Sequence, residues 1–183
     1  MALQCLDTTP LECETTIEEE DAATVIAMWK TNLLSTTANK ATTAKYIEQQ
    51  TDMTIDGLCR TVYTPAQGGK CMLLRDKATG VVAFCGIRYN YRHENYLFER
   101  LVVLPAFRRC GLATFISKAL ITDWKSDWES GGPPGRKLPV PTELEASVDV
   151  LNIAGKKVLS AAGFKFEATH TIAPHIEVWK HRM

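Results

Sequence analysis

The sequence has no excess of charge of either sign, with 21 Lys and Arg residues against 21 Asp and Glu residues among 183. A neutral chain gives no electrostatic reason to expect nucleic acid or an anionic membrane as a partner. The chain also lacks the run of about 20 apolar residues that spans a bilayer, and its start lacks the basic and apolar regions of a signal peptide. We therefore expect a cytoplasmic protein that binds neither nucleic acid nor membrane.

The six cysteines form no Cys-x-x-Cys pair, and neither they nor the four histidines fall at the spacings of zinc ligands. We expect reduced thiols, most of them packed, and no bound metal. The sequence also has no internal repeat. With 183 residues and 45% apolar content, the chain can bury one sizeable core but is short for two. A single domain follows as the expectation.

The charges are unevenly divided along the chain. Residues 1–57 contain ten acids and three bases, whereas residues 58–183 contain eleven acids and eighteen bases. Such a division suits a protein that holds an anionic cofactor with one part and a cationic group with the other. The alternative is that the acidic run at 18–21 only occupies the first turn of a helix, where the helix dipole favours acids.

Hydrophobic periodicity predicts an α/β (mixed α+β) fold. Helical spacing covers residues 18–34, more weakly 40–58, then 111–124 and 152–162, the last ended by Gly163. Strand patterns cover residues 61–64, 71–75, 81–89, 97–104, 143–150, 164–171 and 176–180. The succession of strand, helix and strand from residue 97 to residue 150 favours a right-handed crossover between parallel neighbours, with ligands at the carboxyl ends of those strands.

One segment between a strand and a helix carries a chemical signal: Val103-Leu104-Pro105-Ala106-Phe107-Arg108-Arg109-Cys110-Gly111-Leu112-Ala113-Thr114. Glycine and alanine in a tight turn let successive backbone N–H groups point into one concavity at a helix N-terminus, which suits a pyrophosphate. Arg108 and Arg109 add charge-assisted contacts. Taken alone, a basic turn with a glycine is a modest signal.

The segment resembles the acetyl-CoA loop of the GNAT acetyltransferase superfamily, which reads Val-x-Pro-x-aromatic-Arg-x-x-Gly-x-Gly/Ala. The residues that match are Val103, Pro105, Phe107, Arg108, Gly111 and Ala113. Further matches are Gly86 in an earlier strand, Val148 with Asn152 at a strand end, and the pair Gly163-Phe164. The resemblance indicates one GNAT-type domain over residues 1–183, with a core at about 11–183.

The resemblance implies a mostly antiparallel sheet of about seven strands, whose parallel central pair splays apart, flanked by about four helices. It implies N-acetyl transfer from acetyl-CoA, a co-substrate, to a primary amine in a direct ternary complex. The cofactor-binding residues that it implies are Leu101, Val102 and Val103 in the strand, Arg108, Arg109, Cys110, Gly111, Leu112, Ala113 and Thr114 in the turn, and Asn152. For Asn152, the N-cap of the following helix is an equally good interpretation.

Glu99 is the expected catalytic base, because an amine with a pKa of about 10 must lose a proton before its nitrogen attacks. It interrupts an otherwise apolar strand, and regular alternation puts it on the same face as Leu101 and Val103. The alternative is that Glu99 pairs with an arginine such as Arg88 or Arg100 for structural reasons.

The sequence departs from the family pattern at Leu159, where these enzymes usually have the tyrosine that protonates the leaving thiolate. The proton would come from Ser160, from water or from a side chain such as Tyr96, or the step needs no acid because a thiol leaves moderately well. A second hypothesis is therefore a GNAT-fold module that binds acyl-CoA as a sensor or interaction partner and transfers poorly. A third is an enzyme that uses a longer acyl group.

For the acceptor, the family pattern indicates the first two helices and the loop between the last two strands, here Trp29, Leu33, residues 45–54 and residues 170–175. The acidic first part suits a cationic acceptor such as a polyamine, an aminoglycoside, an amino sugar or a protein amine. Trp29 is more simply explained as a core residue. The Gly- and Pro-rich stretch near residues 130–141 is expected to be a long surface loop, and it is a candidate acceptor lid or homodimer contact.

Overall fold

The computed structural model describes residues 11–36, 63, 65–132 and 138–183. The strands and α-helices in these residues are β1 (Glu12–Glu14), α1 (Glu19–Thr36), β2 (Lys70–Asp76), β3 (Gly80–Asn90), β4 (Asn95–Val103), α4 (Leu112–Glu129), β5 (Glu143–Asp149), α5 (Ile153–Ala161), β6 (Lys165–Thr169) and β7 (Ile176–Arg182). Short 3-10 turns, η3 (Pro65–Gln67) and η4 (Pro105–Phe107), precede β2 and α4. The expected helix at 40–58 and all but one residue of the expected strand at 61–64 lie outside the described residues.

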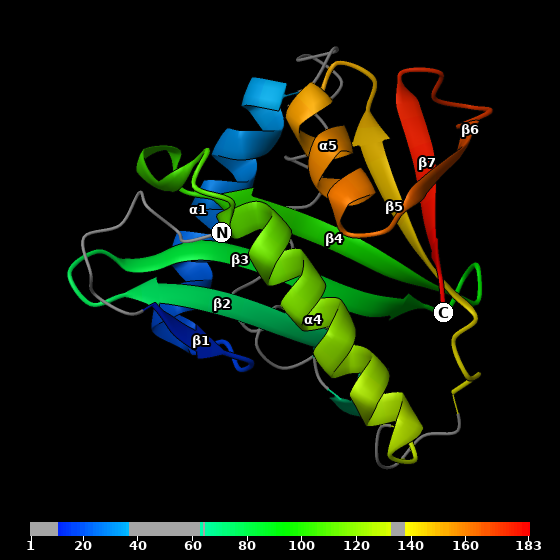
Figure 1. Ribbon diagram of the computed structural model, residues 1–183, viewed down its shortest axis with the longest axis horizontal. Helices are drawn as coiled ribbons and strands as arrows, with labels where there is room; N and C mark the ends of the chain where they lie inside the picture. The colour runs from blue at the N-terminus through cyan, green and yellow to red at the C-terminus, as the bar shows by residue number, and fades with distance from the viewer. Residues whose placement is uncertain (1–10, 37–62, 64, 133–137) are drawn as a thin grey trace.

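All seven strands belong to one sheet, in the order β1-β2-β3-β4-β5-β7-β6 (Figure 1). Every neighbouring pair is antiparallel except β4 and β5, which are parallel. The segment that joins these two strands contains α4, as the predicted crossover requires. The predicted α/β fold with a mostly antiparallel sheet of seven strands is therefore confirmed. β1 is not among the predicted strands, because its three residues carry no apolar alternation.

Helices cover both faces of the sheet. In Figure 1, α4 and α5 lie on one face and α1 lies on the other, and each face has its own apolar cluster. α4 buries Leu112, Ile116, Leu120 and Trp124, one residue per turn, as helical periodicity predicts, whereas Phe115, which the same periodicity places on the apolar face, is 48% exposed. β3 is buried along almost its whole length, because helices cover both faces of this central strand.

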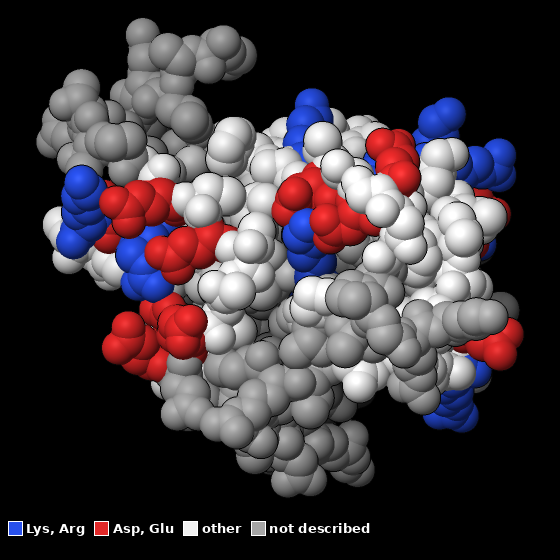
Figure 2. Space-filling view, turned by 90° about the horizontal axis from the view of Figure 1, so that it is seen from below, with Lys and Arg blue, Asp and Glu red and all other residues white. Residues whose placement is uncertain are grey.

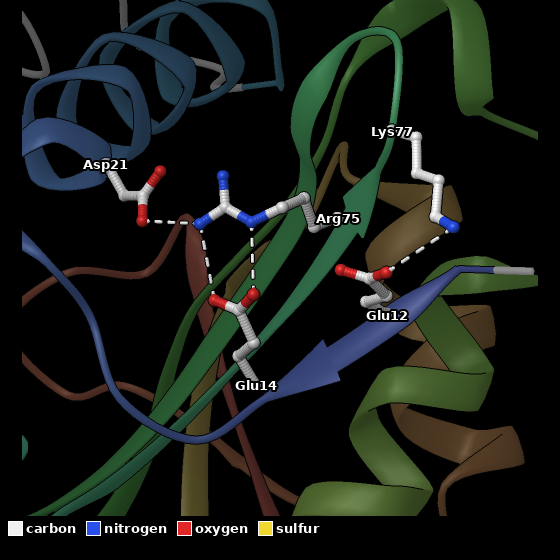
Figure 3. Close-up of polar contacts among 5 residues, drawn as sticks. All are labelled: Glu12, Glu14, Asp21, Arg75 and Lys77. Atoms are coloured by element: carbon white, nitrogen blue, oxygen red, sulfur yellow. Dashed lines mark hydrogen bonds and ion pairs between the residues drawn. The ribbon is translucent and has the colours of Figure 1, made fainter.

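The acidic residues near the start of the described chain pair with bases at the β1–β2 edge of the sheet. The Arg75 guanidinium donates through Nε to Glu14 Oε1 (3.1 Å) and through Nη2 to Asp21 Oδ2 (2.6 Å) (Figure 3). These hydrogen bonds to Glu14 and Asp21 raise the pKa of Arg75. Lys77 Nζ lies 3.9 Å from Glu12 Oε1. These acids therefore hold α1, β1 and β2 together.

Acidic and basic side chains also lie close together away from the β1–β2 edge. On the face that Figure 2 shows, acidic and basic side chains of the described residues lie beside one another. Lys70, for example, lies 2.6 Å from Asp123 and 2.7 Å from Asp127. Of the acids in the first part of the sequence, Glu12, Glu14 and Asp21 are therefore paired with bases.

The expected loop after α4 is described on both sides of residues 133–137. Leu138 packs against the core, and the Pro139 carbonyl accepts a hydrogen bond from the Tyr96 hydroxyl (2.9 Å). A cavity of about 330 Å³ beside the end of α4 is lined by Trp124 and Trp128 among others. The loop after α4 and this cavity therefore lie near the first residues of β4, at the opposite end of this strand from the turn that joins β4 to α4.

Candidate active site

The two parallel strands separate after a short paired stretch. Register pairs join Tyr96 to Leu144 and Leu97 to Glu145 and no later residues of the two strands, although β4 continues to Val103. Figure 1 shows the two strands diverging beyond this point. A strand edge without a partner can accept an extended chain as an added strand. This is the predicted splayed pair, and Leu101, Val102 and Val103 lie in the β4 half that borders it.

The turn between β4 and α4 exposes the start of a helix. Arg109 and Gly111 have left-handed backbone conformations, with φ of 65° and 80°. Gly111 is the N-cap of α4 and provides no side-chain cap. The first helical hydrogen bond runs from the Phe115 N–H to the Gly111 carbonyl (3.0 Å), so the N–H groups of residues 112–114 have no partner within the helix. An uncapped helix start of this kind favours an anion.

The side chains of this turn differ in what they can contribute. Arg108 is turned toward α1, because its Nε donates to the Val103 carbonyl (3.1 Å) and its Nη2 to Asn32 Oδ1 (3.3 Å). Arg109 is exposed, and its side chain makes no hydrogen bond or ion pair with the residues that the structure describes. Leu112 is buried in the core, so only its backbone faces the turn. Of the two arginines expected to contact a pyrophosphate, Arg109 is therefore the available one.

A bulge interrupts β4 beside the opening. The register with β3 jumps from the pair Gly86–Glu99 to the pair Phe84–Val102, so two residues of β4 stand opposite one residue of β3. Arg100, the first of the two, has a left-handed backbone with φ of 58°. An extra residue of this kind bends a strand and reverses the alternation of its side chains.

The bulge corrects one expectation from the sequence. Leu101 and Val103 pack against the cluster on the α4 face, whereas Val102 belongs to the cluster on the α1 face. Glu99 contacts Tyr63, which belongs to the α1-face cluster. The expectation that Glu99 shares a face with Leu101 and Val103 is therefore wrong, because regular alternation does not continue through the bulge.

Three donors hold the Glu99 carboxylate by the same oxygen. Oε1 accepts hydrogen bonds from the Tyr63 hydroxyl (3.0 Å) and Arg88 Nε (2.9 Å), and it lies 3.1 Å from Arg100 Nη1. Oε2 has no partner among the described residues, and the side chain keeps 20% of its surface exposed. The structural pairing considered for Glu99 is therefore present with both arginines, and it leaves the second oxygen open to a further group.

Tyr63 reaches Glu99 through the space that Gly86 leaves in β3. A Cβ atom at Gly86 would lie 2.6 Å from the Cζ atom of the Tyr63 ring. The Tyr63 hydroxyl also accepts a hydrogen bond from Arg100 Nη1 (2.7 Å), and the same guanidinium lies 5.6 Å from the centre of the Trp29 ring. Burial, and next the charge of Glu99, raise the pKa of Tyr63 well above its usual value, so the phenol stays protonated and donates.

Tyr63 is not among the site residues predicted from the sequence, because it lies 36 positions before Glu99 and no spacing rule joins the two. The signal available was Gly86, since a glycine inside a buried strand often marks the close approach of another group.

No protein-family model and no curated protein matches the sequence. Solved structures do match. A GNAT-family acetyltransferase from Staphylococcus aureus aligns with a TM-score of 0.67 at 10% identity, over 94% of this chain and 99% of that chain. The PaiA N-acetyltransferase of Thermoplasma acidophilum in complex with coenzyme A aligns with a TM-score of 0.64 at 12% identity, over 95% and 99%. The spermidine N-acetyltransferase of Vibrio cholerae in complex with CoA and spermine aligns with a TM-score of 0.56 at 11% identity, over 95% and 94%.

The chain has the GNAT acetyltransferase fold. Asn152, which the resemblance implies as a cofactor-binding residue, and Lys156 both stabilise the start of α5 (Ile153–Ala161). Asn152 is the N-cap, and its Oδ1 accepts the Gly155 N–H (2.8 Å). Lys156 Nζ donates to the Val150 carbonyl (2.9 Å) and to Glu177 (3.1 Å), whereas Lys157 is exposed. The capping interpretation of Asn152 is thus confirmed.

At the position where the GNAT pattern usually has an acid, this chain has a buried leucine. Leu159 is 5% exposed and packs in the core, and Ser160 beside it is exposed. Tyr96 is buried at the start of β4, where the parallel strands are still paired, and its hydroxyl is committed to the Pro139 carbonyl. Burial raises the pKa of Tyr96. Tyr96 is therefore excluded as the acid at the opening.

The acceptor candidates are only partly described. Trp29 is 8% exposed and belongs to the core on the α1 face, which confirms its interpretation as a core residue. The side chain of Leu33 and residues 45–54 lie outside what the structure describes. His170 Nδ1 accepts hydrogen bonds from the backbone N–H groups of Ile172 and Ala173, so it stabilises its own turn.

The described residues contain no group of three or more His, Cys, Asp or Glu placed to hold a metal ion. Within them, no helix is long and apolar enough to cross a membrane.

Proposed function

We propose that this protein is an N-acetyltransferase that moves the acetyl group of acetyl-CoA to a primary amine in a direct ternary complex. One observation carries the proposal: the β4–β5 opening, the uncapped start of α4 and the Glu99 carboxylate all lie along or directly after the second half of β4. The structural neighbours add support, since they include acetyltransferases crystallised with CoA and one crystallised with CoA and spermine.

The opening offers backbone groups for the pantetheine arm and for the pyrophosphate of an extended thioester cofactor. Leu101, Val102 and Val103 border the gap in which the pantetheine arm would lie as an added strand. The free N–H groups of residues 112–114 and the exposed Arg109 would hold the pyrophosphate, with Arg108, Cys110 and Gly111 shaping the turn. Asn152 would approach the arm with the part of its amide that the cap does not use.

The chemistry assigned to the chain is proton removal and charge stabilisation. Glu99 Oε2 takes a proton from the ammonium group of the acceptor, and the freed nitrogen pair attacks the thioester carbonyl carbon. A backbone N–H of β4 donates to the oxygen on which charge develops. The C–S bond then breaks, the nitrogen releases its remaining surplus proton to water as the neutral amide forms, and water passes a proton to the departing thiolate, because Leu159 has no proton to give. The protein would do this as one domain over residues 1–183, in the cytoplasm.

A second candidate is a GNAT-fold module that binds acyl-CoA and transfers poorly. Leu159 is the observation that favours it, since a buried leucine replaces the usual acid. The two candidates differ in turnover and agree in cofactor binding.

Thiol release from acetyl-CoA against a panel of amines separates the candidates. We expect amine-dependent release that falls by about two to four orders of magnitude in Glu99→Gln, the usual loss when a general base is removed. The matched control is Glu129→Gln, which changes an exposed glutamate near the end of α4. Calorimetric titration of CoA should give the same affinity for all three proteins. Tight CoA binding without release for any amine would reject the transferase in favour of the binding module.

A further inference from the structure

We infer that the acceptor carries a carboxylate beside its amine, as an amino acid does, and that Arg88 binds this carboxylate. The inference rests on the proposed function and names the substrate class of the same site. It follows from what Arg88 and Arg100 do differently around Glu99.

The Arg100 side chain is largely enclosed by its neighbours. Its side chain is 10% exposed, its guanidinium lies 5.6 Å from the centres of both the Trp29 and Tyr63 rings, and its Nη1 contacts Glu99 and Tyr63. Such a guanidinium fixes Oε1 of Glu99 and stacks on aromatic rings.

Within the part of the chain that the structure describes, Arg88 is bound at one nitrogen. Nε donates to Glu99 Oε1 (2.9 Å), whereas Nη1 and Nη2 have no partner among the described residues. The side chain is 33% exposed, three times as much as that of Arg100. Two neighbouring N–H-bearing nitrogens on a rigid, partly exposed plane are the arrangement that binds a carboxylate.

The charges around this position also favour a zwitterion. Arg88 and Arg100 bring two positive charges to the single negative charge of Glu99, while Glu14 and Asp21 are occupied by Arg75 at the β1–β2 edge. Among the described residues, a polycation would meet one open carboxylate oxygen beside two guanidiniums, and like charges in a partly desolvated site are unfavourable. An amine with an adjacent carboxylate places its ammonium on Glu99 Oε2 and its carboxylate on Arg88. Each charged group then has a partner.

The experiment compares amines that differ only by a carboxylate: L-lysine with cadaverine, L-arginine with agmatine, and L-phenylalanine with phenylethylamine. The measured quantity is the ratio of kcat/KM within each pair, in wild type, Arg88→Met, Arg88→Lys and a control, Arg92→Met, which changes an exposed arginine in the β3–β4 turn. We expect the wild type to prefer the amino acid in at least one pair. Arg88→Met should lower that preference roughly tenfold to a hundredfold, mainly through KM. Arg88→Lys should restore part of it, and Arg92→Met should leave it unchanged.

A merely structural role of Arg88 would lower kcat/KM for both members of a pair and leave their ratio unchanged. An unchanged ratio, or a wild type that prefers the decarboxylated amine in every pair, would overturn the inference while leaving the transferase in place. Failure to acetylate any amine, despite CoA binding, would overturn the proposed function and this inference with it.

Discussion

The Tyr63 hydroxyl donates a hydrogen bond to Glu99 Oε1 across 3.0 Å, and the same oxygen of Tyr63 accepts one from Arg100 Nη1 at 2.7 Å. The phenol therefore stands between a carboxylate and a guanidinium and fixes both. Because Oε1 of Glu99 is occupied in this way, the open Oε2 has a defined position, which is what a proton acceptor at a reacting amine requires.

Tyr63→Phe should weaken both the site and the fold. The change removes one acceptor of the Arg100 guanidinium and one of the donors on Glu99, so we expect a loss of about 1–3 kcal/mol in the free energy of unfolding. We also expect a lower kcat, because Glu99 is positioned less well. Urea unfolding and steady-state kinetics measure the two effects. Tyr91→Phe, at an exposed tyrosine, is the matched control and should be close to neutral in both. Equal behaviour of the two variants would count against the role of Tyr63.

Gly86→Ala should act through Tyr63. The added Cβ meets the Tyr63 ring, so the ring must move away from Glu99, at a cost of about 1–3 kcal/mol for overpacking. A double-mutant cycle with Tyr63→Ala tests this by urea unfolding. In the Tyr63→Ala background the methyl group has room, and Gly86→Ala should then cost much less. Additive losses would show that Gly86 serves another purpose.

Thr114→Glu should separate cofactor affinity from stability. Position 114 is in the first turn of α4, where a carboxylate interacts favourably with the helix dipole, so the melting temperature should stay the same or rise. The same charge would repel a pyrophosphate held by the helix start, so CoA affinity should fall at least about tenfold. Thr122→Glu, at an exposed position of the same helix, should leave CoA affinity unchanged. Calorimetric titration and thermal unfolding measure the two quantities, and unchanged affinity in Thr114→Glu would move the anion site elsewhere.

Arg75→Met should destabilise the fold without altering the active site. It leaves the Asp21 carboxylate, whose side chain is 7% exposed, without its guanidinium, so we expect a loss of about 2–4 kcal/mol in the free energy of unfolding. Lys77→Met breaks an exposed pair with Glu12 and should change stability by less than about 0.5 kcal/mol (Figure 3). Denaturant unfolding compares them. Similar losses in both variants would mean that Asp21 does not depend on Arg75.

Much of the fold follows from patterns within the sequence. Periodicity identified the strands that became β2 to β7, and the motif that starts at Val103 marked the turn onto α4, because each signal lies within one continuous segment. α4 extends to Glu129, five residues past the predicted end, since Trp128 adds one more turn of apolar contact.

The arrangement of side chains around Glu99 did not follow from the sequence. Alternation misplaced Glu99 relative to Leu101 because the left-handed conformation of Arg100 leaves no signature in residue type. The partnership with Tyr63 depends on a contact 36 positions away. The acidic residues near the start suggested a cationic acceptor, yet Glu14 and Asp21 are bound to Arg75. The number of acidic residues can be read from the sequence, but which of them form ion pairs is seen only in the three-dimensional structure.

The most direct test of the account is mass spectrometry of the acceptor and of the intact protein after incubation with acetyl-CoA. We predict that the amine gains one acetyl group on nitrogen, that the protein itself stays unacetylated in the absence of amine, and that Glu99→Gln largely abolishes the product while still binding CoA. An unmodified amine alongside bound acetyl-CoA, or an acetyl group trapped on the protein, would contradict direct transfer at Glu99.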